Sequence, residues 1–162
     1  MQPIVIIASG MAGYTLAREF RKLNPEQELV LICADDASNY AKPTLSNALV
    51  GNKQPEQIAL GYAEKMSTQL NMRIEVSTEV KAIHSDKHEL VLENNGISST
   101  QAYSKLILAV GANPIRLAIA GDGSDDILVV NSLTDYRKFR ETLDRAQDKR
   151  VLILGAGLIG CE

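Results

Sequence analysis

The sequence has few of the features that mark a metal protein, a secreted protein or a membrane protein. Its only two cysteines, Cys33 and Cys161, lie far apart and form neither a metal-binding nor a redox spacing. This cysteine usage predicts a reducing compartment, the cytoplasm, and no metal site. No apolar run is long enough to cross a bilayer, and the N-terminus has neither the basic stretch nor the cleavage site of a signal peptide.

The chain also lacks a strong charge of either sign. Its 162 residues carry a net charge of -3, which argues against an extended surface for nucleic acid or for an anionic membrane. The hydrophobic content of 45% is enough for a core, and the length allows one domain or one domain and part of another. The two histidines, His84 and His88, flank a polar turn without further ligands nearby, so we interpret them as solvated.

Glycines are placed at two informative positions, the first directly after the apolar run Ile4–Ile7. A glycine at position 10 lets a pyrophosphate approach the backbone, and Gly13 lets the following helix pack closely on the strand. Ala8 replaces the first glycine of this dinucleotide fingerprint. Alanine is tolerable at this turn if its φ is negative and costly if its φ is positive. The residues expected to bind the cofactor here are Ser9, Gly10, Met11, Ala12 and Gly13.

The pattern after this fingerprint completes a strand–helix–strand unit. Apolar residues at helical spacing run from Met11 to Leu23, and Leu29–Cys33 is again typical of a buried strand. Ala34 and Asp35 follow that strand, where an acid is expected to bind ribose hydroxyls. The alternative is that the glycines only form a turn and that Asp35 is a solvated loop acid.

The middle of the chain contains shorter segments. Short helices are predicted at Pro43–Leu49 and Ala63–Leu70, followed by a small antiparallel meander with turns such as Asn94–Gly96. The predicted meander strands are Arg73–Val76, Val80–Ile83, Glu89–Glu93 and Gln101–Tyr103.

The last third begins with a predicted buried strand at Leu106–Val110. A short strand is predicted at Ile127–Val130, and a helix capped by Ser132 or Thr134 is predicted to run to about Arg145. The strand pattern Val151–Leu154 then leads into a second fingerprint, which retains all three glycines: Gly155, Gly157 and Gly160. Two such motifs indicate a protein that holds two dinucleotides and transfers electrons between them.

Together with Tyr40–Asn47 and Ala109–Pro114, the two fingerprints resemble the FAD-dependent pyridine-nucleotide oxidoreductases, most strongly their rubredoxin–NAD reductase branch. The resemblance implies an α/β fold. A Rossmann-like FAD-binding domain, with a parallel sheet and a small antiparallel meander, would occupy residues 1–114. The beginning of a Rossmann-like NAD(P)-binding domain would occupy residues 115–162. The resemblance covers about the first two-fifths of such an enzyme, so we expect the chain to be a truncated portion that is inactive by itself.

The resemblance also implies roles for single residues. FAD would lie on the first fingerprint, with Asp35 near the adenosine ribose and the backbone around Val80 touching the adenine. Lys42 and Glu162 would lie near the flavin and act in catalysis. The turn that returns the chain to the FAD domain would contain Ala109 and Gly111, and the second fingerprint would bind NADH or NADPH.

The function implied is transfer of electrons from NAD(P)H through FAD to rubredoxin or a similar small iron–sulfur carrier. In the family that the chain resembles, coenzyme A-disulfide reductases and peroxide-reducing NADH oxidases carry a cysteine near the position of Ser46, and the chain has none there. That absence disfavours the alternative of an NADH oxidase or peroxidase. A truncated flavin-binding fragment without turnover is the third interpretation.

Overall fold

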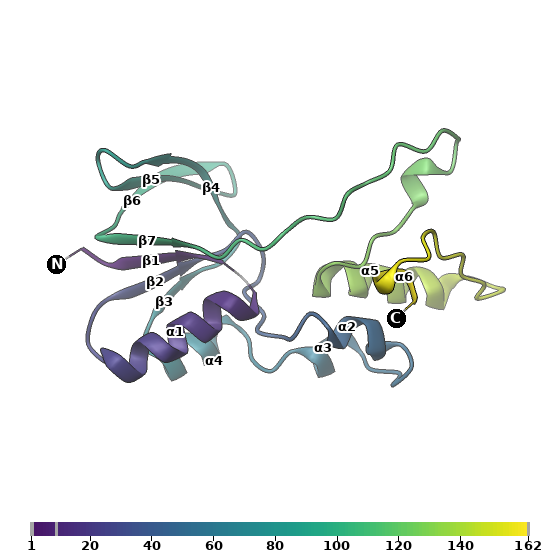
Figure 1. Cartoon of the computed structure of the whole chain (residues 1–162), viewed down its shortest axis with the longest axis horizontal. Coiled ribbons are helices and arrows are strands. Elements are labelled where there is room, and N and C mark those ends of the chain that lie inside the picture. Colours follow the sequence, from purple (N-terminus) through teal and green to yellow (C-terminus); the bar gives the residue numbers. More distant parts are fainter. Residues whose placement is uncertain (1, 9, 162) are drawn as a thin grey trace. The chain divides into compact units, whose positions relative to one another are not determined.

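A computed structural model describes residues 2–8 and 10–161 of the chain (Figure 1). The chain forms two compact units. The first contains residues up to 40 together with Ala59–Gly111, and the second contains Ala41–Ile58 together with the residues from Ala112 onward.

A parallel sheet is the centre of the first unit. Its four strands are arranged in the order β3-β2-β1-β7, and Val5 pairs with Val30 on one side and with Leu106 on the other. Because β1 and β2 are the inner strands and are covered on both faces, they are continuous apolar runs rather than alternating ones. The strands are β1 (Ile4–Ile7), β2 (Leu29–Ile32), β3 (Arg73–Glu75) and β7 (Lys105–Leu108).

Helices cover one face of this sheet and an antiparallel sheet covers the other (Figure 1). On the helical face, Ile6 and Leu31 pack with Tyr14 of α1 (Met11–Leu23) and Met66 of α4 (Ala63–Leu70). On the opposite face, the core consists of Val5, Val30 and Ile32 with Leu90, Leu92 and Tyr103. The predicted α/β fold class, with its parallel sheet and small antiparallel sheet, is confirmed.

The antiparallel sheet is a meander of three strands in the order β4-β5-β6. Asn95 and Gly96 connect β5 to β6, both with positive φ, as a two-residue type I′ turn requires. The strands are β4 (Thr78–His84), β5 (Glu89–Asn94) and β6 (Ile97–Ala102).

Two strand predictions in this unit need correction. The segment Arg73–Val76 was predicted in the meander, but β3 pairs in parallel with β2 and extends the main sheet. The Leu106–Val110 strand was predicted to be buried, but β7 is an edge strand and Leu108 is 58% exposed. In both cases, the position in the sheet rather than the local pattern decides the pairing and the burial.

The second unit is helical in the part that the structure describes. Ser132 caps α5 by accepting a hydrogen bond from the Asp135 amide, and the Tyr136 hydroxyl donates to the Lys53 carbonyl at 2.8 Å. The helices are α2 (Thr44–Ala48), α3 (Pro55–Ile58), the 3-10 helix η1 (Ser124–Asp126), α5 (Leu133–Arg145) and α6 (Leu158–Cys161). No helix of the described residues has the length and apolar character needed to cross a membrane.

The strands predicted at Ile127–Val130 and Val151–Leu154 are not formed. All four side chains of Val151–Leu154 are exposed, with Leu152 at 93%. A parallel strand is stable only beside other strands, and the described part of the second unit provides none.

An isolated antiparallel bridge marks where the chain leaves the first unit and returns to it. The Asn39 amide donates to the Gly61 carbonyl and the Leu60 amide donates to the Asn39 carbonyl, each at 2.8 Å. The segment 41–58 therefore leaves and re-enters at adjacent points.

Candidate functional site

The carboxyl end of the parallel sheet presents the start of α1. Gly10 is the N-cap, in an extended conformation, and it has no side chain to cap the helix. The amides of Met11, Ala12 and Gly13 lie in the first helical turn, where amides have no intrahelical acceptor. That turn holds no acidic residue, so the positive end of the helix is available for an anion.

The spaces around the two glycines of this fingerprint are opposite in kind. A Cβ at Gly13 would lie 2.5 Å from the Cβ of Ala8, so only glycine permits this approach of helix to strand. At Gly10, apart from the glycine and its chain neighbours, no described residue has an atom within 4 Å of the position that a Cβ would take. Gly13 thus serves packing, and Gly10 leaves open space beside the backbone.

Ala8 occupies the position of the missing first glycine without strain. It is not one of the described residues with a positive φ, and its amide donates to the Ile32 carbonyl at 3.0 Å. Its side chain is buried, in contact with the core below α1. The strand conformation therefore continues through Ala8, which meets the requirement stated from the sequence.

The end of β2 carries the acid expected at the ribose. The Asp35 carbonyl accepts from the Ser77 amide at 2.9 Å, and its Oδ1 accepts from the Ala37 amide at 2.9 Å. Ala37 has a positive φ, and the Tyr14 hydroxyl donates to its carbonyl at 2.5 Å. Asp35 is therefore held in a fixed turn at the strand end, half-buried, beside the exposed Ala34.

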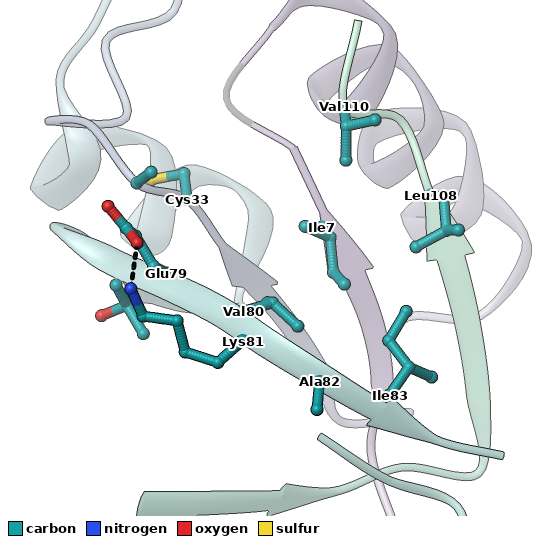
Figure 2. A pocket seen from close by; sticks show the side chains of 11 residues that line it. Ile7, Cys33, Glu79, Val80, Lys81, Ala82, Ile83, Leu108 and Val110 are labelled. Atoms are coloured by element: carbon teal, nitrogen blue, oxygen red, sulfur yellow. Dashed lines mark hydrogen bonds and ion pairs between the residues drawn. The ribbon is translucent and has the colours of Figure 1, made fainter. Parts of the chain in front are cut away.

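A cavity of about 650 Å³ lies between the ends of the parallel strands and β4 (Figure 2). Its walls are largely apolar, with Ile7 from β1, Leu108 from β7 and Val80 from β4 (Figure 2). The remaining lining residues are Cys33, Ala34, Thr78, Glu79, Lys81, Ala82, Ile83 and Val110. A hollow of this size with apolar walls and a few polar groups at its rim suits a flat aromatic ring system.

The rim of the cavity contains residues that the sequence reasoning missed. The β4–β5 register shifts between Val80 and Ala82, which places Lys81 at an irregularity of the ladder. Lys81 contacts Glu79 at 2.6 Å and Glu93 at 3.3 Å, and the hydrogen bond from Lys81 lowers the pKa of the Glu79 carboxyl. This irregularity can be recognised only from the pairing of β4 with β5. The sequence by itself gives no signal for it.

Burial controls the titration of Cys33, which lines the cavity, and of Tyr14, which lies in the core on the helical face of the sheet. Desolvation raises the pKa of the Cys33 thiol to about 12, and the Asp35 charge adds to this rise. Burial likewise raises the pKa of the Tyr14 hydroxyl. Both groups are therefore neutral near pH 7, and Cys33 acts as a small packing residue rather than a nucleophile.

The third strand end supplies the turn predicted at residues 109–111. The Ala109 amide donates to the Ile7 carbonyl at 2.9 Å, which continues the pairing of β7 with β1. Gly111 has a φ of +69°, which disfavours any residue with a side chain there. The first unit thus brings together, at the carboxyl end of its parallel sheet, Gly10–Gly13, Ala34, Asp35, Val80 and Ala109–Gly111.

The other predicted site residues belong to the second unit or cannot be placed. Lys42 is exposed, and its Nζ donates to Asn131 Oδ1 at 3.2 Å. Ser9 and Glu162 lie outside the described residues.

The second fingerprint has part of the backbone geometry expected of it. Gly155 has a φ of +114°, and a Cβ at Gly160 would collide with the Gly155 carbonyl oxygen. Gly157 lies directly before α6, and apart from its chain neighbours no described residue has an atom within 4 Å of the place of a Cβ. The glycine geometry is therefore present, although the strand before it is not.

The family model described as Pyridine nucleotide-disulphide oxidoreductase matches residues 2–162. The chain belongs to this family. As a member of the pyridine nucleotide-disulphide oxidoreductase family, it is 77% identical to Rubredoxin-NAD(+) reductase of Acinetobacter baylyi over 162 residues, which are all of this chain and 41% of that protein. It is 38% identical to the protein of the same name from Alcanivorax borkumensis, again over all of this chain and 41% of that protein. The chain thus spans less than half the length of these relatives.

Solved structures of the pyridine nucleotide-disulphide oxidoreductase fold agree with the architecture. The water-forming NADH oxidase from Lactobacillus brevis matches with a TM-score of 0.86 and 21% identity, over 99% of this chain and 36% of that one. The NADH:rubredoxin oxidoreductase from Clostridium acetobutylicum matches with a TM-score of 0.75 and 23% identity, over 98% of this chain and 39% of that one. At these identities, the likeness shows the fold.

Proposed function

We propose that the chain is the FAD-binding portion of an NADH-dependent flavoprotein reductase that delivers electrons to rubredoxin or a similar small iron–sulfur carrier. The observation that carries this proposal is the 77% identity, across all 162 residues, to a protein named Rubredoxin-NAD(+) reductase. In this proposal, residues 1–114 form the FAD-binding domain and residues 115–162 begin the NAD(P)-binding domain.

The residues of the first unit fit FAD. The space beside Gly10 lies at the uncapped start of α1, where a pyrophosphate would meet the amides of Met11, Ala12 and Gly13. Asp35 would accept hydrogen bonds from ribose hydroxyls, and the apolar cavity beside Val80 would hold the adenine. Ser9, Ala34, Ala109 and Gly111 would complete the cofactor contacts as backbone or small residues that permit close approach.

Two further residues, Lys42 and Glu162, would act at the reacting end of the cofactor. Lys42 would approach the flavin as a cation, and Glu162 would lie where the nicotinamide docks. Gly155, Gly157 and Gly160 would admit the pyrophosphate of NADH or NADPH. The chemistry that bound FAD supplies is the acceptance of two electrons from the nicotinamide and their release one at a time.

The experiment is anaerobic mixing of the full-length, FAD-loaded protein with NADH and then with oxidised rubredoxin. We expect NADH to bleach the flavin absorbance and rubredoxin to restore it, with NADPH compared in parallel. Molecular oxygen in place of rubredoxin is the control, and faster reoxidation by oxygen would favour an NADH oxidase. A flavin that NADH does not bleach would refute the reductase proposal.

A variant at the first fingerprint tests the cofactor site separately. Gly10→Ala introduces a Cβ into space that no described atom occupies, so the fold is expected to persist while FAD affinity falls. Calorimetric titration of the apoprotein with FAD measures the change. Unaltered affinity would show that the pyrophosphate does not lie beside Gly10.

A further inference from the structure

Asn131 contacts Lys42, which is the only predicted catalytic residue among those that the structure describes. Its Oδ1 accepts from Lys42 Nζ at 3.2 Å, and its Nδ2 donates to the Ala112 carbonyl at 3.3 Å. Because the two ends of the amide have different partners, the amide has one favoured orientation, with the oxygen toward Lys42.

The backbone of Asn131 is itself fixed by the start of α5. The Asn131 amide donates to Asp135 Oδ2 at 3.1 Å, and the Ser132 hydroxyl donates to the same oxygen at 2.8 Å. The Asp135 amide in turn donates to Ser132 Oγ at 3.1 Å. This reciprocal cap places Asn131 directly before the helix, in a position that the capping residues define.

α5 is also attached to the segment that carries Lys42. Tyr136 bonds the Lys53 carbonyl, and Arg140, which is 8% exposed, donates to Asn52 Oδ1 at 3.0 Å. The segment 41–58 and the start of α5 are therefore joined near Lys42 and again near residue 52. The helix therefore fixes the position of the segment that carries Lys42.

We propose that Asn131 is a positioning residue that holds the Lys42 side chain in one conformation before FAD binds. The inference rests on the proposed function, because it assumes that Lys42 faces FAD. A free lysine loses considerable rotamer entropy when it binds a ligand, and a side chain held in place before binding avoids that loss.

A double-mutant cycle on FAD affinity, in the full-length apoprotein, tests this role. Asn131→Ala should raise the FAD dissociation constant roughly fivefold, the scale expected for one side chain that must be immobilised on binding. Asn131→Asp keeps an oxygen acceptor for the ammonium and should retain near-normal affinity. In a Lys42→Met background, Asn131→Ala should cause no further loss. Thr134→Ala, at an exposed position of the same helix start, is the control and should have no effect.

The outcomes separate the inference from the function beneath it. If Asn131→Ala weakens FAD binding equally with Lys42→Met present, Asn131 acts through the helix cap or Ala112, and the inference is overturned. It is also overturned if Lys42→Met weakens binding and Asn131→Ala does not. If Lys42→Met itself has no effect, the placement of Lys42 at the flavin fails, and the inference falls with it.

Amine labelling gives a readout that needs no cofactor. Acylation of Lys42, followed by peptide mass spectrometry, should be faster in Asn131→Ala than in the unmodified protein, because the ammonium is no longer held. Lys87, which lies in the exposed turn between β4 and β5, is the internal reference. An unchanged Lys42 rate, relative to Lys87, would overturn the inference.

Discussion

Single side chains at the first fingerprint divide the work between folding and binding. Gly13 and Ala8 share one small volume between helix and strand, whereas the volume beside Gly10 stays open. From the sequence, both glycines could be predicted as parts of a cofactor motif. The separation of their roles could not, because it depends on which atoms the fold brings within 4 Å of each backbone.

The contact between positions 8 and 13 leads to a stability prediction. Gly13→Ala should lower the free energy of unfolding by about 1–3 kcal/mol, because the new methyl group overlaps the Ala8 Cβ. Combining it with Ala8→Gly should recover most of the loss, since the deleted methyl makes the room. Urea denaturation of the single and double variants measures both effects. An equal loss in the double variant would exclude this contact as the cause.

The buried thiol of Cys33 predicts that the folded protein loses stability at alkaline pH. Its folded pKa, about 12, lies above the usual value of 9.0, so the folded thiol keeps its proton while the unfolded thiol loses it. The unfolded state therefore binds fewer protons above pH 9, and stability contributed by this group is full below that pH and falls toward pH 12. Tyr14, whose pKa is also raised, contributes in the same direction above pH 10.

The measurement is the midpoint of urea unfolding between pH 8 and pH 11. We expect the midpoint to fall with rising pH, and to fall less steeply in Cys33→Ala. Identical slopes in the two proteins would assign the alkaline loss to other groups.

Helices and strands differed in how far local patterns could predict them. The predicted helix from Met11 to Leu23 and the predicted helix Ala63–Leu70 are confirmed, because helical periodicity and stop signals are local. Strand partners are not local. The alternation at Arg73–Val76 is compatible with either sheet, and the apolar run Val151–Leu154 has no neighbouring strand. Whether such a segment forms a strand, and in which sheet, depends on its pairing partners, which the sequence alone does not reveal.

The start of α5 offers a test of one helix signal. The sequence left Ser132 and Thr134 as alternative caps, and the structure assigns the cap to Ser132. Ser132→Ala should lower the free energy of unfolding by about 1 kcal/mol, because the Asp135 amide loses its acceptor. Thr134→Ala, the matched control, should change stability by less than about 0.5 kcal/mol. Thermal unfolding followed by circular dichroism compares the two, and equal losses would contradict the assignment.

The candidate site lies at the carboxyl end of the parallel sheet. Residues of this site come from the ends of β1, β2 and β7 and from β4, which are up to about a hundred positions apart in sequence. The fingerprint and Asp35 were predicted from the sequence, since the family pattern contains them. The cavity walls at Ile7, Leu108 and Ile83 were not, because they are ordinary apolar residues until the two sheets are assembled.

The exposed apolar segment at the second fingerprint affects the behaviour of the chain in solution. A protein of these 162 residues should bind the dye 8-anilinonaphthalene-1-sulfonate and associate, because Leu152 and Ile153 are 93% and 65% exposed. Replacing both with lysine should reduce dye fluorescence and the mass seen in light scattering. The same double change at Leu23 and Ile97, which are also exposed but isolated, is the control. Equal effects of the two double changes would place the association elsewhere.

The bridge between Asn39 and Gly61 has a consequence for changes of length in segment 41–58. Its hydrogen bonds hold the exit and the return of segment 41–58 at adjacent points. A loop whose ends are pinned together lengthens or shortens at little entropic cost, since the closure entropy grows only slowly with loop length. A change of length in segment 41–58 should therefore leave the sheet unchanged, whereas it would alter the contacts of Asn52 and Lys53 with α5.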